Sequence, residues 1–191
     1  MAILMVMMAP MLKNALTGTA LNRGADQVIG LLSTARQTAL TRGQTVEVRF
    51  YCYKDPQNSK EVAANSSNYH ALQAFTIDDA GAATPLSKIQ TLPISVIMAT
   101  NIFNSSQAST LLTNATNSTF SIPRVKTSYS YASFLYYRGG TTSLMNTPST
   151  VWCVTVVNSS ELTNATRCPT NYTTIVINPY NGQLTPYRPT L

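Results

Sequence analysis

The sequence predicts an α+β fold in which one long N-terminal helix packs against an antiparallel β-sheet. Helical spacing of apolar residues is confined to residues 1–43, whereas from residue 44 onward apolar and polar residues alternate as in strands. A single helix followed only by strands is typical of the α+β class. The length of 191 residues fits one domain. We therefore expect a helical segment 1–43 and a β-rich part 44–191, which share one domain with the amphipathic half of the helix.

The first third of the predicted helix is apolar on every side. Residues 1–12 read MAILMVMMAPML, and Lys13 ends the run. Twelve helical residues rise about 18 Å, whereas a bilayer core of about 30 Å needs about 20 residues. No basic residue precedes the run, as one would in a secretory signal. We interpret it as the second half of a longer apolar segment, and a short core helix of a soluble protein is the alternative. Pro10 is expected to kink the helix.

The remainder of the helix is amphipathic and is expected to lie on the sheet. Apolar residues recur at spacings of three and four from Val28 to Ala39, while Arg36 and Arg42 lie among the polar positions. Gly43 supplies the stop. We expect the sheet to cover the helix from Val28 onward.

Strands are predicted wherever apolar and polar residues alternate between turn-forming segments. Residues 45–53 carry Val46, Val48, Phe50 and Cys52 on one face and polar or aromatic residues on the other. Residues 150–157 are apolar on both faces and therefore central. The Asn181-Gly182 turn predicts a closing hairpin. The remaining predicted strands are residues 69–77, 92–99, 131–138, 172–177 and 183–188.

Composition and charge favour an extracytoplasmic protein that binds no nucleic acid. The net charge is +6, but the thirteen basic residues are scattered along the chain instead of forming a cluster. Attraction to an anionic membrane surface near the helix explains this mild excess of positive charge better than nucleic-acid binding does. Only 10% of residues are charged, and Asn, Thr, Ser and Tyr supply the polarity, which suits strand-rich extracytoplasmic domains.

No constellation of residues indicates an enzyme, a cofactor or a metal. His70 is the only histidine, and its place in an alternating segment predicts a surface or half-buried strand position. The sequence holds no nucleotide-binding or hydrolase motif. Asp78 and Asp79 precede Gly81 at a predicted turn, where a solvated turn is favoured over a calcium site because few other acids lie nearby.

Three cysteines and several glycosylation-type sequons remain. Cys153 and Cys168 flank a polar stretch, so a disulfide in an oxidising compartment and two free thiols are both open. Cys52 is expected to point into the core. We interpret the sequons as loop composition. They begin at Asn65, Asn104, Asn114, Asn117, Asn158, Asn164 and Asn171.

Several segments, in order, resemble a known family. The start AILMVMMAP, the amphipathic ADQVIGLLSTARQTALTRGQ and the strand VEVRFY are similar to type IV pilin-like proteins and to minor pseudopilins of the H type. The pieces YHALQAF, LPISVIM, YASFLYYRGGTTSL, VWCVTVV and NYTTIVINPYNGQLTPYRP most resemble the Verru_Chthon cassette protein D family of verrucomicrobial bacteria. The likeness covers most of the chain. Family members carry a leader ending in Gly, then an aromatic residue and a Glu, none of which is present here. We therefore expect a start site placed too late, and the alternative is that this copy is not processed.

The resemblance implies a non-enzymatic structural subunit of a pilus-like or type II secretion-like envelope assembly. It implies other pilin-like subunits and the bacterial inner membrane as partners, a periplasmic or extracellular β domain, and a prepilin peptidase if a leader precedes the sequence. The expected assembly and membrane surface of the helix consists of Leu4, Val6, Met7, Pro10, Leu12 and Leu16.

A binding module is the second hypothesis. In this interpretation a secreted or surface-exposed β-rich domain recognises a polymer or a protein through a tyrosine-rich surface. Fractionation separates the two hypotheses, because membrane-bound protein supports the subunit and a soluble monomer supports the module. The tyrosines expected on that surface are Tyr129, Tyr131, Tyr136 and Tyr137.

Overall fold

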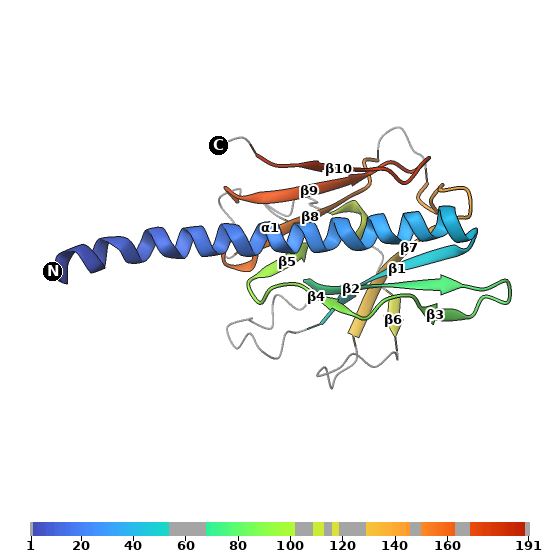
Figure 1. The fold of residues 1–191 in the computed structure, drawn as a ribbon, viewed down its shortest axis with the longest axis horizontal. Coiled ribbons are helices and arrows are strands. Elements are labelled where there is room, and N and C mark those ends of the chain that lie inside the picture. Colours follow the sequence, from blue (N-terminus) through green and yellow to red (C-terminus); the bar gives the residue numbers. More distant parts are fainter. Residues whose placement is uncertain are drawn as a thin grey trace.

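A computed structural model confirms the α+β class, with one long helix lying across one antiparallel sheet (Figure 1). The structure describes residues 2–53, 68–101, 109–112, 116–118, 129–145, 150–162 and 169–189, without the side chains of residues 2–16 and 116–118. Helix α1 spans Ala2–Arg42. The strands are β1 (Thr45–Cys52), β2 (Tyr69–Ile77), β3 (Ala83–Pro85), β4 (Gln90–Thr91), β5 (Val96–Ala99), β6 (Thr116–Ser118), β7 (Tyr129–Tyr136), β8 (Cys153–Asn158), β9 (Tyr172–Ile177) and β10 (Leu184–Tyr187), with 3-10 turns η2 (Thr110–Leu112) and η3 (Ser159–Glu161).

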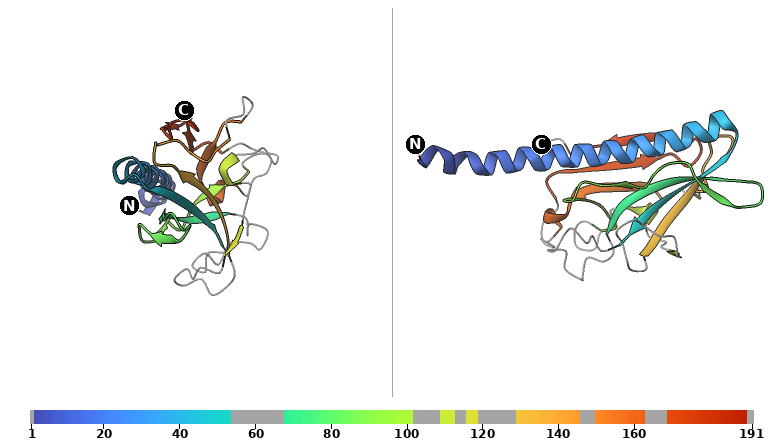
Figure 2. Two further views of the ribbon diagram at one scale, coloured as in Figure 1. Left: turned by 90° about the vertical axis from the view of Figure 1, so that its right-hand side faces the viewer. Right: turned by 60° about the horizontal axis from the view of Figure 1, so that its bottom comes forward.

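The sheet consists of two wings, one made of β10, β9, β8 and β5 and the other of β2, β1, β7 and β6. The two wings share little backbone pairing. The strand order of the sheet is β10-β9-β8-β5-β2-β1-β7-β6, and β3 and β4 pair with β2 beside this path. Tyr69↔Met98 is the register pair that joins β2 to β5, whereas β5 and β8 pair along four residues. Helix α1 contacts both wings and crosses the place where they meet (Figures 1 and 2). The helix therefore holds the wings together through side-chain packing.

The buried stripe of α1 begins earlier than the sequence predicted. Leu21 is 2% exposed and Ala25 is fully buried, so the sheet covers the helix from Leu21 and not from Val28. Gly24 lies so close to β5 that a methyl group there would approach Val96 Cγ1 to 2.7 Å. Because a glycine occupies this contact position, the helical spacing of apolar residues did not reveal that the sheet reaches this part of the helix. The predicted stop is confirmed, because Gly43 follows the helix with φ +58°.

Both faces of β1 are covered. Val46, Val48 and Phe50 point into the main core beneath α1, as predicted. On the opposite face, Tyr51 is fully buried and Glu47 is 9% exposed. The alternation was predicted correctly, but the polar residues do not mark a solvent face, because aromatic rings from β2 and β7 cover them.

A β-bulge reverses the facing of residues at the start of β2. Tyr51 pairs with Ala71 while Cys52 pairs with Tyr69, so β2 has one extra residue at His70. Tyr69 consequently joins the core beneath α1, while His70 lies against the Tyr53 ring. The sequence prediction of a surface or half-buried His70 is wrong, since the side chain is 5% exposed.

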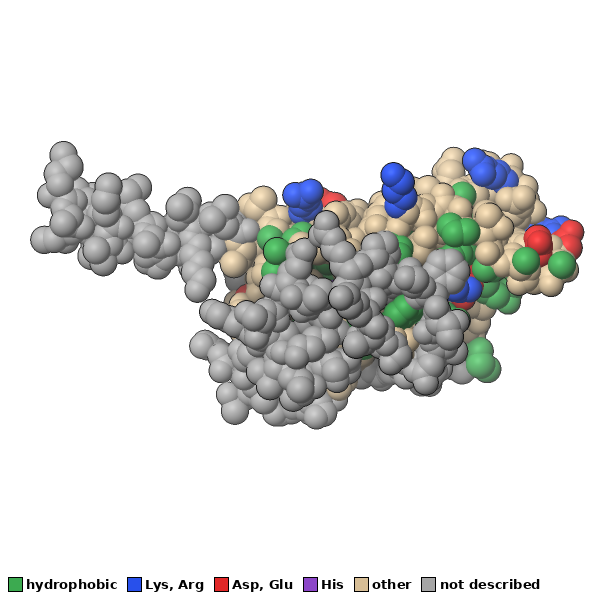
Figure 3. Space-filling view, turned by 90° about the horizontal axis from the view of Figure 1, so that it is seen from below, with side chains coloured by type: hydrophobic (Ala, Val, Ile, Leu, Met, Phe, Trp, Pro, Cys, Tyr) green, Lys and Arg blue, Asp and Glu red, His purple; other side chains and the backbone are tan. Residues whose placement is uncertain are grey.

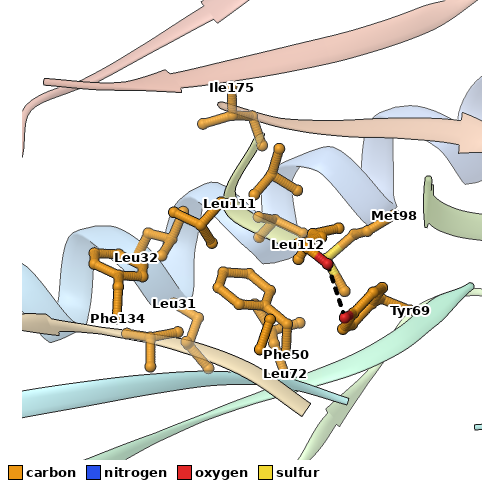
Figure 4. Close-up of a cluster of buried hydrophobic side chains, with 14 of the residues drawn as sticks. Leu31, Leu32, Phe50, Tyr69, Leu72, Met98, Leu111, Leu112, Phe134 and Ile175 are labelled. Atoms are coloured by element: carbon orange, nitrogen blue, oxygen red, sulfur yellow. Dashed lines mark hydrogen bonds between the residues drawn. The ribbon is translucent and has the colours of Figure 1, made fainter. Parts of the chain in front are cut away.

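A 3-10 turn inside a polar stretch completes the core. Leu111 and Leu112 of η2 are buried between β7 and β8, which are not neighbours in the sheet (Figure 4). The Tyr69 hydroxyl donates to the Leu112 carbonyl oxygen at 3.0 Å and fixes the turn. The sequence analysis placed no element in this segment.

The closing hairpin and the central strand agree with prediction. Strands β9 and β10 pair from Leu184↔Ile177 to Tyr187↔Thr174. Gly182 has φ +64°, and a methyl group at this position would meet the Tyr136 ring at 2.5 Å. Strand β8 lies between β5 and β9, and its residues from Val154 to Asn158 are all buried.

Candidate functional site

The expected assembly residues lie on the part of α1 that extends beyond the sheet (Figures 1 and 2). Their backbone is helical, and the helix continues through Pro10 without interruption, whereas their side chains lie outside the described set. The predicted surface therefore stays a prediction for Leu4, Val6, Met7, Pro10, Leu12 and Leu16. Within the described chain, no helical window has both the length and the apolarity of a membrane span.

A groove runs along one flank of the covered half of α1. One wall consists of α1 residues and the other of residues from β2, β4 and the segment between β3 and β4. The lining residues are Gln27, Gly30, Leu31, Thr34, Thr38 and Arg42 on the helix, and Ala74, Leu86, Ser87 and Gln90 on the opposite side. Its volume is about 490 Å³. A methyl group added at Gly30 would have no heavy atom within 4 Å, so this glycine opens the wall. The sequence analysis did not predict this groove, because its two walls come from segments that lie far apart in the sequence.

A second cluster lies on the face of the sheet away from α1. Arg49 Nη2 lies 2.6 Å from Glu47 Oε2, and both side chains are almost buried. The guanidinium carbon lies 4.3 Å above the Phe75 ring centroid and 5.0 Å from that of Tyr131. Burial lowers and the nearby Glu47 carboxylate raises the pKa of Arg49, with a net increase. The cation is held between two rings, which stabilises it away from water.

A hydrogen-bonded chain ties this cluster to the edge of the groove. The Tyr51 hydroxyl donates to Gln73 Oε1 at 3.0 Å, and Gln73 Nε2 donates to the Ser87 carbonyl oxygen at 2.8 Å. Burial raises the pKa of Tyr51, to which the neighbouring Tyr129 adds. Ser87 thus belongs both to the cluster and to the groove, and its backbone position is fixed from two sides.

The predicted tyrosine surface is not formed. Tyr136 is fully buried beneath α1, and Tyr129 is 6% exposed. Tyr131 is partly buried beside Arg49, and of the four tyrosines Tyr137 alone is exposed, at 41%. Tyr136 packs into the main core, whereas Tyr129 and Tyr131 pack beside Tyr51 and Arg49 on the other face of β7. Neither face of the strand therefore presents a row of exposed rings.

Several exposed apolar side chains belong to segments near the end where α1 finishes. Gly140 lies against Leu40, and its N–H donates to the Tyr137 carbonyl oxygen, while Trp152 donates to the Met145 carbonyl oxygen. Scattered exposed apolar residues are normal, whereas a contiguous apolar patch marks an interaction surface. We call this set the apolar end surface. It consists of Leu40, Tyr137, Met145, Val151 and Tyr180.

Charged side chains do not form a continuous patch on the visible face. Basic residues stand apart from one another in Figure 3. Arg138 pairs with Asp79, and Arg188 lies 3.9 Å from Asp26. The Asp78 carboxylate accepts the Ala80 and Ala82 N–H groups and so closes its own turn. In the described part of the chain, no three His, Cys, Asp or Glu side chains lie together as metal ligands.

Cysteines and sequons have mainly local roles. Cys52 is buried in the core, as predicted. Cys153 begins β8 opposite Val176, at the end of the strand farthest from the loop that leads to β9. Cys168 lies outside the described residues, so the disulfide stays a prediction. Among the sequons, Asn158 is 4% exposed and its side chain accepts the Ser160 N–H, which begins η3.

The remaining sequons belong to loops or lie outside the described side chains. Asn171 is exposed. Asn65, Asn104, Asn114 and Asn164 fall outside the described residues, as does the side chain of Asn117.

Comparison with known proteins gives one structural likeness. No protein-family model and no curated protein matches the sequence. Among solved structures, the chain is similar to the type IV minor pilin FimU of Pseudomonas aeruginosa, strain PAO1. The two share 12% sequence identity with a TM-score of 0.47, over 89% of this chain and 92% of that chain. The resemblance to the verrucomicrobial family stays a prediction from the sequence.

Proposed function

We propose that the protein is a non-enzymatic, pilin-like structural subunit that assembles through the exposed part of α1. The observation that carries this proposal is that one continuous helix has two parts, one packed on the sheet and one that extends beyond it. Its described core contacts begin at Leu21, whereas the backbone helix starts at Ala2. The intervening 19 residues rise about 28 Å beyond the covered half. Residues 2–12 of this segment are all apolar, and an apolar helical stretch is stabilised by contact with an apolar partner.

The free energy available from covering this segment is large. Residues 3–12 contain eight large apolar side chains, namely Ile, Val, two Leu and four Met. Full burial of each contributes about 1.5–3 kcal/mol, or about 12–24 kcal/mol in total as an upper bound. Loss of translational and rotational freedom on association costs about 4–15 kcal/mol. The upper bound on the gain covers most of the range of this cost, which supports association of the helix with neighbouring helices or a membrane.

The finer assignment is a minor-pseudopilin-like subunit of a pilus-like or type II secretion-like assembly. Other pilin-like subunits and the bacterial inner membrane are its partners, and the β domain lies in the periplasm or outside the cell. The low charge and the many Asn, Ser and Thr residues support an extracytoplasmic domain. The mechanism is transfer of the apolar helix from the membrane into a bundle of neighbouring helices.

The test places charges on the exposed part of α1. A Leu4→Asp/Met7→Asp variant should leave the membrane fraction and lose cross-links between subunits, without a change in melting temperature. Ser33→Asp, a matched control on the exposed face of the covered half, should behave like the original chain. Unchanged fractionation and cross-linking of the double variant would contradict the proposal.

A binding module is the second candidate function. The apolar end surface favours it, because Met145 and Val151 are 73% and 60% exposed. A soluble monomer whose partner binding is lost in Met145→Ser/Val151→Ser would support this candidate. Loss of membrane association only in the Leu4→Asp/Met7→Asp variant would favour the structural subunit.

A further inference from the structure

The two flanks of α1 are held differently by the sheet. On the side of β9 and β10, Arg36 Nε donates to the Asn181 carbonyl oxygen at 2.8 Å, and Asp26 lies 3.9 Å from Arg188. On the side of β3 and β4, the groove separates the helix from the strands. The fold therefore leaves one flank of a well-packed helix open.

The groove has firm walls. The bend between β3 and β4 leaves the ladder at Leu86 and Ser87, whose N–H groups both donate to the Ala74 carbonyl oxygen. The Ser87 hydroxyl accepts the Ala74 N–H at 3.2 Å, and Gln73 donates to the Ser87 carbonyl oxygen at 2.8 Å. These bonds hold the wall that faces the helix in place against β2. The groove is therefore preformed, as ligand sites usually are.

The lining combines an aliphatic floor, neutral polar groups and one cation. Gln27 Oε1 is buried and has no hydrogen-bond partner among the described residues, so it is an acceptor that lacks a donor. Thr38 is 8% exposed. Arg42 is exposed and forms no ion pair within the described chain. A ligand that offers an N–H group and a carboxylate complements these groups.

The groove favours an extended chain. From Gln27 to Arg42 the helix rises about 22 Å, which an extended peptide covers with six or seven residues. Gln27 Oε1 is an acceptor that lacks a donor. In a helix the main-chain N–H groups are bonded within the helix, whereas an extended segment leaves main-chain N–H groups free to donate to this oxygen.

We propose that this groove binds an extended, acidic peptide segment of a partner protein. An aliphatic side chain of the segment lies on Leu31 and Leu86, a main-chain N–H donates to Gln27 Oε1, and a carboxylate pairs with Arg42. The lining contains no aromatic ring and only one cation, which disfavours nucleic acid. The proposal is independent of the assembly role, because the groove lies on the covered half of α1.

The test uses a phage-displayed library of random heptapeptides, selected on the full-length protein in detergent. Enrichment of clones that combine Asp or Glu with aliphatic residues is expected. Gly30→Leu adds a side chain to the helix wall of the groove at a position where an added Cβ meets no heavy atom within 4 Å. It should weaken binding of the enriched peptides at least tenfold. Ser33→Leu, the same addition on the neighbouring exposed turn, should leave their affinity unchanged.

A second pair of variants tests the charge. Arg42→Gln should abolish the preference for acidic over amidated versions of the enriched peptides, whereas Arg23→Gln, elsewhere on the exposed helix, should not. Failure to enrich any clone, or equal binding by Gly30→Leu, overturns the proposal. Sedimentation of the protein alone tests another occupant. If Gly30→Leu removes self-association without affecting peptides, the groove holds a second copy and the proposal is wrong.

Discussion

Two glycines of α1 make a matched test of how the helix meets the sheet. Replacing glycine by alanine inside a helix contributes about 0.8–1.0 kcal/mol through helix propensity. At Gly30, no heavy atom lies within 4 Å of the added methyl group. Gly30→Ala should therefore stabilise the protein by up to about 1 kcal/mol.

Gly24 is expected to respond in the opposite direction. Its added methyl group would lie 2.7 Å from Val96 Cγ1, 3.5 Å from Val96 Cβ and 3.6 Å from Pro93 Cδ. Val96 is fully buried and β-branched, so its side chain has little freedom to rotate away. Overpacking of this kind costs about 1–3 kcal/mol. The propensity gain offsets part of this cost, and we expect Gly24→Ala to destabilise the protein by up to about 2 kcal/mol.

The assay is urea unfolding of both variants on the same background, followed by far-UV circular dichroism. Since the propensity gain is common to both variants, they should differ by the overpacking cost of about 1–3 kcal/mol, which corresponds to about 2–12 °C in melting temperature for a chain of this size. Adding Val96→Ala should recover the clash component of Gly24→Ala, as a coupling energy in a double-mutant cycle. If Gly24→Ala is as stable as Gly30→Ala, the close approach of α1 to β5 is wrong.

The core and the helix that covers it lead to three further predictions. Burial, with a smaller contribution from Cys52, raises the pKa of Tyr69 from 10.0 to about 12. The stabilising effect of the neutral hydroxyl is therefore complete below pH 10, and it is lost as the pH rises towards 12. Urea midpoints should fall between about pH 9 and pH 12, and Tyr69→Phe should make that fall shallower. Glu47→Ala should cost about 2–4 kcal/mol because it leaves the almost buried Arg49 unpaired, and adding Arg49→Met should recover most of that loss in urea unfolding. Removal of residues 1–16 should preserve the thermal transition of the β domain, whereas removal of residues 1–25 should lower it because Leu21 leaves the core.

Strong periodicity made most of the main elements predictable. The alternation from Val46 to Phe50 and the Asn181-Gly182 turn are local signals, and they indicate β1 and the last hairpin without reference to other segments. Strands β3 and β4 have three and two residues, which is too short for any period to appear. They were missed for that reason.

The candidate sites were less predictable because they depend on contacts between distant segments. Tyr136 is buried by α1 and by the backbone at Gly182. Both segments lie more than 45 residues from Tyr136 in the sequence. A bulge of one residue at His70 determines which residues of β2 face the core. The groove arises from Gly30 together with a bend more than 50 residues later. Periodicity within one element carries no information on such pairings.

The narrow connection between the two wings has a consequence for the order of folding. Strands β1 and β2 with β3 and β4 are close in sequence, and β8, β9 and β10 form a second local set. Local sets form early because closing their loops costs little entropy. Since Tyr69↔Met98 is the register pair between the wings, docking of the wings depends on packing of α1, and we expect amide protons within each set to become protected before the wings dock on the helix. Helix α1, which is synthesised before the strands, would then be the last element to pack.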